Sequence, residues 1–374
     1  MDRYGFLKTA AAIPSVRVAD CAYNGERIAA LVAEAAGRGV EVVLFPELSV
    51  TGYTCGDLFL QPALLAAAEQ ALAELLRRTA ELNTAFVVGL PVAVDDMLYN
   101  CAVVAAAGEV LGVVPKCHIP DYAEFYESRW FASGQGRPTV EIELCGQSVP
   151  FGPDLLFDIG GARCAVEICE DLWVPAPPSA EAATAGAEVI LNLSASPETV
   201  GKSDYVRQLV VQQSARTRAA YLYCSAGFGE SSTDLVFAGH ALVAENGAVL
   251  AASERFSLGE QLVVADVDCQ LLRNDRCRTT TFVCSPVMCT SMPSRRVITA
   301  APPPMLSPRT QTVQPDSSVT VTSIVLGCAK SSAWGSGVKE NASPFAEAQR
   351  KESRTRRSSA ANPSMPATSA LSVP

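Results

Sequence analysis

Short apolar runs alternate with longer segments whose apolar residues recur at helical spacing, and this pattern covers roughly residues 5–266. The runs predict strands, and the longer segments predict helices. The predicted strands are 5–13, 40–45, 85–90, 99–106, 110–114, 155–159, 163–168, 188–192, 220–225, 240–244, 248–252 and 261–266; the predicted helices are 22–37, 62–83, 179–186 and 205–218. Tight turns such as Asn246-Gly247 join some neighbouring strands directly, which favours mixed sheets. We therefore expect an α/β protein with two sheets and helices outside them.

Three of the predicted strands run directly into a reactive side chain. Glu47 follows the second strand across Pro46, Lys116 follows the fifth across Pro115, and Cys169 follows the strand 163–168. The stretch from Cys169 onwards reads CEDLWVPAPP, which is typical of a sharp strand-to-helix turn. A carboxylate, an ammonium and a thiol could thus meet at one edge of a sheet.

These three residue types form a complete set for nucleophilic catalysis. A cysteine attacks only as the thiolate, so it needs a base and a charge partner. Glu47 would take the proton, Cys169 would attack a carbonyl or nitrile carbon, and Lys116 would stabilise the negative charge that develops. The alternative is that each residue is structural, since Lys and Glu often begin loops and a cysteine at a strand end often packs in the core.

The two histidines, His118 and His240, have no metal-ligand spacing. We expect both to be structural or loop residues, and a Cys-His dyad remains the less favoured alternative for the nucleophile.

Composition narrows the class of protein. The chain has 374 residues, 49% of them hydrophobic, and a formal net charge of −10, which argues against nucleic acid or a membrane surface as partner. Its 13 cysteines include no CxxC pair, as expected for reduced thiols. The N-terminus lacks the pattern of a secretion signal and no run has membrane-span length, so a cytoplasmic location is predicted.

The character of the chain changes near residue 284. Residues 1–283 carry 19 Lys and Arg against 35 Asp and Glu, whereas residues 284–374 carry 10 against 4. Ser, Thr, Pro and Ala make up 44 of residues 291–374, a composition that predicts disorder. Such a tail could also be the out-of-frame reading of another domain. Its Gly335-Ser336-Gly337 is typical of a flexible segment, not of a phosphate-binding loop.

Several motifs resemble the nitrilase superfamily. They are FPELSVTGY (45–53), VVPKCHIPDYAEFYESRWFASG (113–134) and CAVEICEDLW (164–173). A narrower similarity is to the glutamine amidase domains of bacterial glutamine-dependent NAD synthetases. It rests on ICEDLWVPAPPS, NLSASP (192–197), QQSARTRAAYLY (212–223) and GESSTDLVFAGH (229–240). The resemblance covers roughly residues 5–283, which we predict to be one carbon-nitrogen hydrolase domain, with 284–374 as a separate tail.

The resemblance implies a four-layer α-β-β-α sandwich and assigns the site. Glu47 would be the general base, Lys116 the oxyanion stabiliser and Cys169 the nucleophile. An additional glutamate near the lysine would be Glu127, with Glu124 as its competitor. The residues expected at the amino-acid part of glutamine are Tyr122, Glu170 and Ser196.

The implied reaction is hydrolysis of L-glutamine to glutamate and ammonia through a thioester on the cysteine, with neither a metal nor a cofactor. ATP and deamido-NAD would be used only by a synthetase domain, whose phosphate loop is not in this sequence and which could act in trans. A homo-oligomer is also implied. Two alternatives stay open: another nitrilase-type amidase acting on an ω-amide or N-carbamoyl substrate, and a catalytically inert assembly subunit.

Overall fold

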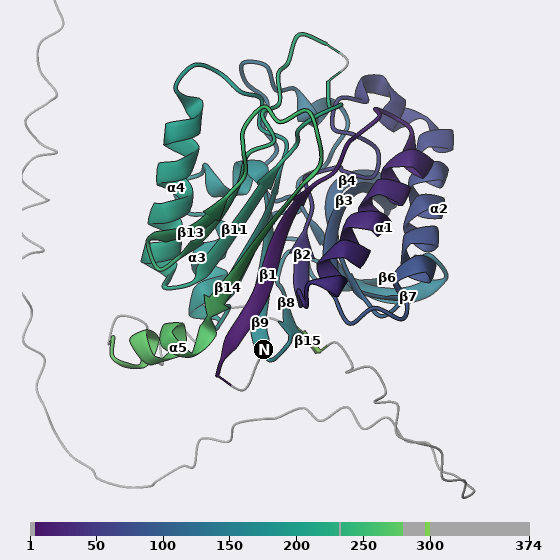
Figure 1. Ribbon diagram of the computed structural model, residues 1–374. Helices are drawn as coiled ribbons and strands as arrows, with labels where there is room; N and C mark the ends of the chain where they lie inside the picture. Colours follow the sequence, from purple (N-terminus) through teal and green to yellow (C-terminus); the bar gives the residue numbers. More distant parts are fainter. Residues whose placement is uncertain (1–3, 232, 280–295, 300–374) are drawn as a thin grey trace, which may run out of the picture. The chain divides into compact units, whose positions relative to one another are not determined.

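The structure is a computed structural model that describes residues 4–231, 233–279 and 296–299 (Figure 1). The predicted disorder of the tail falls almost wholly on residues outside these ranges. Within them the ten cysteines are all free thiols, as expected from their spacing. Every helix in the same ranges is too short or too polar to cross a membrane.

The first sheet has eight strands in the described residues. They are β1 (Phe6–Ile13), β2 (Val42–Leu44), β3 (Ala85–Val94), β4 (Met97–Ala106), β5 (Glu109–Pro115), β6 (Val140–Leu144), β7 (Gln147–Phe151) and β14 (Gln261–Asp268). Their order is β14-β1-β2-β3-β4-β5-β7-β6. β1, β2 and β3 are parallel, whereas β14, β4 and β5 each pair antiparallel with a neighbour, so the prediction of a mixed sheet is confirmed.

The second sheet has seven strands in the described residues. They are β8 (Leu155–Ile159), β9 (Ala162–Ile168), β10 (Val189–Ser194), β11 (Ala220–Ser225), β12 (Ala241–Glu245), β13 (Ala248–Ala252) and β15 (Arg296–Thr299). Their order is β13-β12-β11-β10-β9-β8-β15, with β9, β10 and β11 parallel at its centre. β15 adds a parallel edge strand beside β8, which the sequence pattern did not predict.

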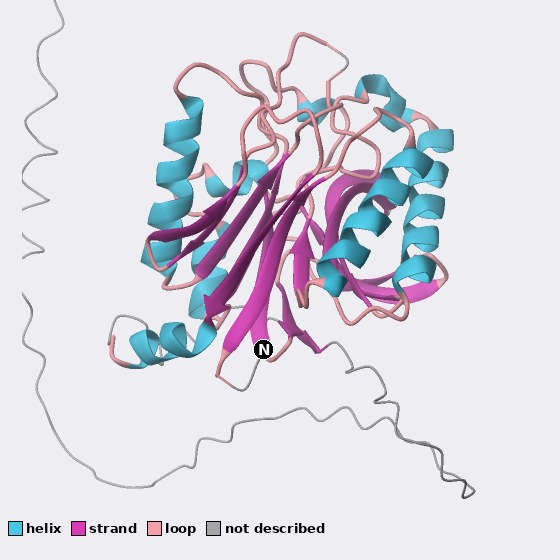
Figure 2. Ribbon diagram, in the orientation of Figure 1, coloured by secondary structure: helices cyan, strands magenta, loops and turns pink. Residues whose placement is uncertain are grey.

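Five α-helices accompany the sheets in the described chain: α1 (Cys21–Gly37), α2 (Pro62–Thr79), α3 (Pro178–Thr184), α4 (Lys202–Thr217) and α5 (Cys269–Cys277). In Figure 2, α1 and α2 cover the outer face of one sheet, and α3 and α4 cover the outer face of the other. Alternation within the strands explains the layers. In β1, for example, Ala10 and Ala12 pack toward α1 and α2, while Leu7 and Ala11 face the second sheet. The four-layer α-β-β-α prediction is confirmed.

Helix boundaries follow local chemistry. Asp20 caps α1 by accepting a hydrogen bond from the Tyr23 amide, and Gly39 ends the turn beyond it at φ +74°. The predicted helix 62–83 ends earlier, at Thr79, because the chain turns there toward β3. The Thr84 hydroxyl fixes that turn by donating to the Val40 carbonyl at 2.6 Å.

Besides β15, the sequence analysis missed the β6–β7 hairpin and α5. The alternation of Val140, Ile142 and Leu144 with glutamates is a strand pattern, and Cys145 and Gly146 form the tight turn at positive φ. α5 is short and mostly polar, so its periodicity is weak.

The turn that carries Glu47 packs directly on β3 at Gly89. A Cβ at Gly89 would lie 2.1 Å from the Leu48 nitrogen and 2.9 Å from the Glu47 carbonyl carbon. Leu48 itself has φ +50°, so this turn has little freedom to move away. Only glycine therefore allows the turn and the strand to approach this closely.

We expect Gly89→Ala to lower the free energy of unfolding by about 1–3 kcal/mol, because the new methyl group forces the turn away from the strand. Gly37→Ala is the matched control: a Cβ there meets nothing within 4 Å, and α1 should be stabilised by up to about 1 kcal/mol. Urea unfolding measures both. Equal stabilities for the two variants would contradict the close approach.

Candidate active site

Glu47, Lys116 and Cys169 lie together where β2, β5 and β9 end. Lys116 follows β5 directly, and Cys169 opens a 3-10 turn, Cys169–Leu172, directly after β9. Glu47 lies in the turn after β2, where its amide donates to the Ser194 carbonyl of β10 at 3.2 Å. The two sheets thus meet at this point through a backbone hydrogen bond.

Lys116 is the centre of the cluster. Its Nζ lies 2.7 Å from Glu47 Oε1 and 2.8 Å from both carboxylate oxygens of Glu127. The side chains of Lys116 and Glu47 are 0% exposed and that of Glu127 is 2% exposed. One buried ammonium is therefore held by two buried carboxylates.

Burial and the neighbouring charges shift the pKa values of Lys116 and Glu127. Burial opposes the charge of Lys116, but Glu127 and Glu47 outweigh it, so the pKa of the ammonium is well above its usual value. Burial raises the pKa of Glu127, and the neighbouring Glu47 raises it further against the opposing effect of Lys116. Lys116 therefore stays protonated, which suits it to electrostatic stabilisation and not to proton transfer.

The two oxygens of Glu47 have different surroundings. Oε1 accepts from Lys116 and, at 2.7 Å, from Asn100 Nδ2. Oε2 is buried and has no hydrogen-bond partner among the described residues. A carboxylate held by one oxygen with the other unoccupied can accept a proton from a neighbouring group.

Cys169 sits in a strained, buried position. It has φ +45°, unusual for a residue with a side chain, and it is 3% exposed. Burial raises the pKa of its thiol, Glu47 adds to that effect, and Lys116 and the Ala195 amide oppose it. The net direction is upward, so the resting group is a thiol that needs a base when it reacts.

Asp171 fixes the Cys169 turn relative to Lys116. Its carboxylate accepts from the Ile168 amide at 3.0 Å and from the His118 amide at 2.8 Å. The same carboxylate lies 2.8 Å from His118 Nδ1, and this contact raises the pKa of the imidazole. His118 thus has the structural role predicted for it, and His240 packs edge-on against Tyr223.

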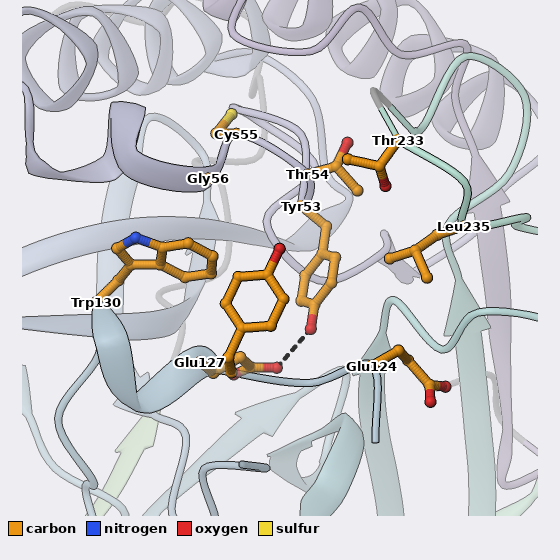
Figure 3. Close-up of a pocket in the computed structure, with 10 residues that line it drawn as sticks. Tyr53, Thr54, Cys55, Gly56, Glu124, Glu127, Trp130, Thr233 and Leu235 are labelled. Atoms are coloured by element: carbon orange, nitrogen blue, oxygen red, sulfur yellow. Dashed lines mark hydrogen bonds between the residues drawn. The ribbon is translucent and has the colours of Figure 1, made fainter. Parts of the chain in front are cut away.

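The structure distinguishes the two glutamates that sequence reasoning left in competition. Glu127 contacts Lys116 and also accepts from the Tyr53 hydroxyl at 2.8 Å. Glu124 instead lines the cleft beside Cys169 and also a second cavity next to it. The Tyr53–Glu127 hydrogen bond is drawn in Figure 3, where it borders this second cavity, about 170 Å³ in volume, whose wall includes Trp130 and Leu235.

The cleft beside Cys169 has a volume of about 240 Å³ and brings together the three residues expected at the amino-acid end of a substrate. Tyr122, Glu170 and Ser196 all line it. The Tyr122 hydroxyl lies 3.0 and 3.1 Å from the two oxygens of Glu170. Burial, aided by Glu170, raises the pKa of Tyr122 to about 12, so the hydroxyl remains a donor.

Three residues that position the cluster were not predicted. Tyr53 and Asn100 donate to its carboxylates, and Asp171 links two of its strand ends. Asn100 carried a readable signal, because it interrupts an otherwise apolar strand. Tyr53 and Asp171 stand inside motifs quoted above, but only the folded chain shows what they contact.

Comparison with known proteins places this site in a family. Residues 8–276 match the carbon-nitrogen hydrolase family. The chain belongs to this family. Its solved relatives include a glutamine-dependent NAD(+) synthetase from Cytophaga hutchinsonii, with 29% identity, a TM-score of 0.64, and coverage of 70% of this chain and 43% of that one. An amidase from Nesterenkonia sp. AN1 shares the fold at 21% identity and a TM-score of 0.56, covering 74% of this chain and 96% of its own.

Among curated relatives of this carbon-nitrogen hydrolase, the glutamine-dependent NAD(+) synthetase of Mycobacterium tuberculosis is 47% identical over 284 residues. The match covers 75% of this chain and 42% of the relative. The chain therefore spans less than half the length of that relative.

A further buried carboxyl lies two residues before Cys169 on β9. Glu167 accepts from the Ser179 amide at 2.8 Å and from the Tyr221 hydroxyl. Burial raises the pKa of Glu167 to about 7, although these hydrogen bonds oppose the shift. The folded protein therefore binds a proton here that the unfolded chain has already lost at neutral pH.

The stability that this proton provides is complete below the unfolded pKa and is lost as the pH rises through about 7. Glu167→Gln mimics the protonated acid, so its unfolding free energy minus that of the wild type should increase by about 2–3 kcal/mol from pH 4.5 to 8. Denaturant unfolding across this range measures the difference. Glu181→Gln, at an exposed position on α3, is the control and should run parallel to the wild type; parallel curves for Glu167→Gln would contradict the shift.

Proposed function

We propose that the chain hydrolyses the side-chain amide of L-glutamine, using Cys169 as nucleophile, Glu47 as general base and Lys116 as the cation that stabilises the oxyanion. The observation that carries the proposal is the Lys116 ammonium held against Glu47 beside a buried thiol. The relatives that match most of this chain are named glutamine-dependent NAD(+) synthetases, which supports glutamine as the amide donor.

The chemistry follows from the protonation states. Glu47 Oε2 takes the thiol proton as the sulfur bonds to the amide carbon, and the carbonyl oxygen becomes an oxyanion near Lys116. Glu47 returns the proton to the nitrogen, the C–N bond breaks, and ammonia leaves a thioester on Cys169. Glu47 then takes a proton from water, which attacks the thioester. The C–S bond breaks, glutamate leaves, and Glu47 returns the proton to the sulfur, which restores the Cys169 thiol.

The cleft suits the amino-acid end of glutamine. Glu170 would receive the α-ammonium group, and Tyr122 and Ser196 would donate to or accept from the remaining polar atoms. Because Tyr122 already donates to Glu170, it also holds that carboxylate in place. Glu127 would serve as an auxiliary residue by holding Lys116.

We place this activity in glutamine-dependent NAD synthesis, where the ammonia would be consumed by a synthetase domain that uses ATP and deamido-NAD. Such a domain lies outside the carbon-nitrogen hydrolase region 8–276 and could act in trans. The amidase step itself uses no cofactor in this proposal. The homo-oligomer implied by the family resemblance stays a prediction.

The deciding measurement is release of glutamate and ammonia from glutamine by the full chain and by Cys169→Ala. We expect release by the wild type to fall at least about 10³-fold in the variant, because the nucleophile is lost. Cys164→Ala is the matched control: it removes a buried cysteine within β9, five residues before Cys169, and should leave turnover within about threefold.

Equal turnover by the wild type and Cys169→Ala would exclude this thiol as the nucleophile. If glutamine is not turned over but an ω-amide or N-carbamoyl substrate releases ammonia, the proposed amidase chemistry stands and glutamine is not its substrate. No turnover of any of these by a folded chain would favour the inert subunit.

Tyr122→Phe tests the binding role of the cleft. Without the hydroxyl, Glu170 loses a donor and glutamine loses a polar contact, so the KM should rise about 5- to 20-fold while kcat changes little. Steady-state kinetics with glutamine measure both. An unchanged KM would remove Tyr122 from the substrate site.

A further inference from the structure

The motif GESSTDLVFAG contains a buried carboxylate that the reaction does not use. Glu230 lies in the loop between β11 and β12 and is 8% exposed. Its Oε2 accepts from the Tyr53 amide at 2.9 Å, and its Oε1 accepts from the Thr54 amide at 3.0 Å and from the Thr54 hydroxyl at 2.8 Å. We call these three hydrogen bonds the Glu230 clamp.

The clamp joins the two halves of the sandwich at the site. Tyr53 and Thr54 belong to the segment that follows the Glu47 turn in the first sheet, whereas Glu230 comes from a loop of the second sheet. The residues are 176 and 177 positions apart in the chain. Charged acceptors make the stronger class of hydrogen bond, so this contact fixes the backbone of Tyr53.

The loop that presents Glu230 is itself held at its base. Gly229 has φ +91°, and a Cβ there would lie 2.0 Å from the Val16 carbonyl oxygen. The Val16 amide also donates to the Phe228 carbonyl at 3.1 Å. Glu230 is therefore presented from a backbone that has little room to shift.

From Tyr53 the contacts lead into the catalytic cluster. The Tyr53 hydroxyl donates to Glu127 Oε1, and Glu127 holds Lys116 through both oxygens. Figure 3 shows the Tyr53 ring extending from its loop to the Glu127 carboxylate. Because the ring is rigid, the Tyr53 backbone position and the two side-chain torsions together set where the hydroxyl lies.

We propose that Glu230 is a positioning residue that sets the place of Lys116 through Tyr53 and Glu127. The inference rests on the proposed function, since it concerns the cation of that reaction. Glu230 lines neither the cleft beside Cys169 nor the second cavity, and its role is to fix the geometry at which the oxyanion meets Lys116.

The test is a kinetic cycle in the full chain with Glu230→Ala, Tyr53→Phe and the double variant. Misplacing a catalytic group by about an ångström costs roughly 10²-fold. We expect Glu230→Ala to lower kcat about 10- to 100-fold with KM within about threefold. The double variant should be no more than about threefold slower than Glu230→Ala, because both changes act on the same contact.

Glu188→Ala is the matched control. Glu188 is also a buried carboxylate that accepts from a backbone amide, that of Arg163, but it lies at the opposite end of β10 from Ser194. Its loss should lower Tm and leave kcat within about threefold at 25 °C.

If Glu230→Ala lowers Tm and leaves kcat unchanged in the same way, or if its effect on kcat multiplies with that of Tyr53→Phe, the inference is overturned. Should Glu230→Ala not fold, Glu230→Gln takes its place, because it keeps the side-chain volume and loses one acceptor oxygen.

A second measurement separates this inference from the proposed function. Alkylation of Cys169 by iodoacetamide, followed by peptide mapping, needs no glutamine and depends on Lys116 near the thiol. In one outcome the wild type shows no glutamine turnover while Glu230→Ala, but not Glu188→Ala, slows alkylation severalfold. That result would exclude glutamine as the substrate and support the positioning role of Glu230. Normal turnover and normal alkylation in Glu230→Ala would overturn the positioning role of Glu230 and leave the proposed function intact. Neither turnover nor alkylation in the wild type would overturn both.

Discussion

The buried ammonium of Lys116 is the constraint on which the rest of the site depends. Removing an ion from water costs several kcal/mol even after the protein relaxes, and removing one partner of a buried pair costs about 3–5 kcal/mol. Here the buried charge of one ammonium faces two buried carboxyl groups. Asn100 and Tyr53 donate to Glu47 and Glu127, and these hydrogen bonds offset part of the cost of burying that charge.

The same buried cluster also affects the protonation of the Cys169 thiol. In many enzymes with a catalytic cysteine, a neighbouring cation lowers the pKa of the thiol, and the thiolate is the resting form. In this protein burial and Glu47 outweigh Lys116, and the pKa of Cys169 lies above its usual value. In the proposed reaction the thiol must therefore lose its proton as it attacks, and the unpartnered Oε2 of Glu47 is placed to receive it.

The sequence predicted the features that depend on neighbouring residues, namely the strands and the points where they end. Apolar runs predicted the central strands, and the prolines at 46 and 115 marked the strand ends that deliver Glu47 and Lys116. It could not predict the contacts of Tyr53, because a tyrosine in a loop has no periodic pattern and its partner lies 74 residues away. The β6–β7 hairpin had the right alternation and was still missed, since it follows a long irregular segment with no pattern to mark its start.

The site geometry depends finally on how the two sheets are held together. The core between them is apolar, and packing of this kind allows sideways movement more readily than hydrogen bonds do. At the site end, polar contacts cross from one sheet to the other: the Glu47 amide with Ser194, His118 with Asp171, and Tyr53 with Glu230. Each begins within a few residues of a member of the cluster, so a shift of one sheet past the other would break hydrogen bonds before it separated Cys169 from Lys116. The proposed catalytic set is drawn from two sheets, and it can keep its geometry because the contacts that join the sheets are concentrated beside it.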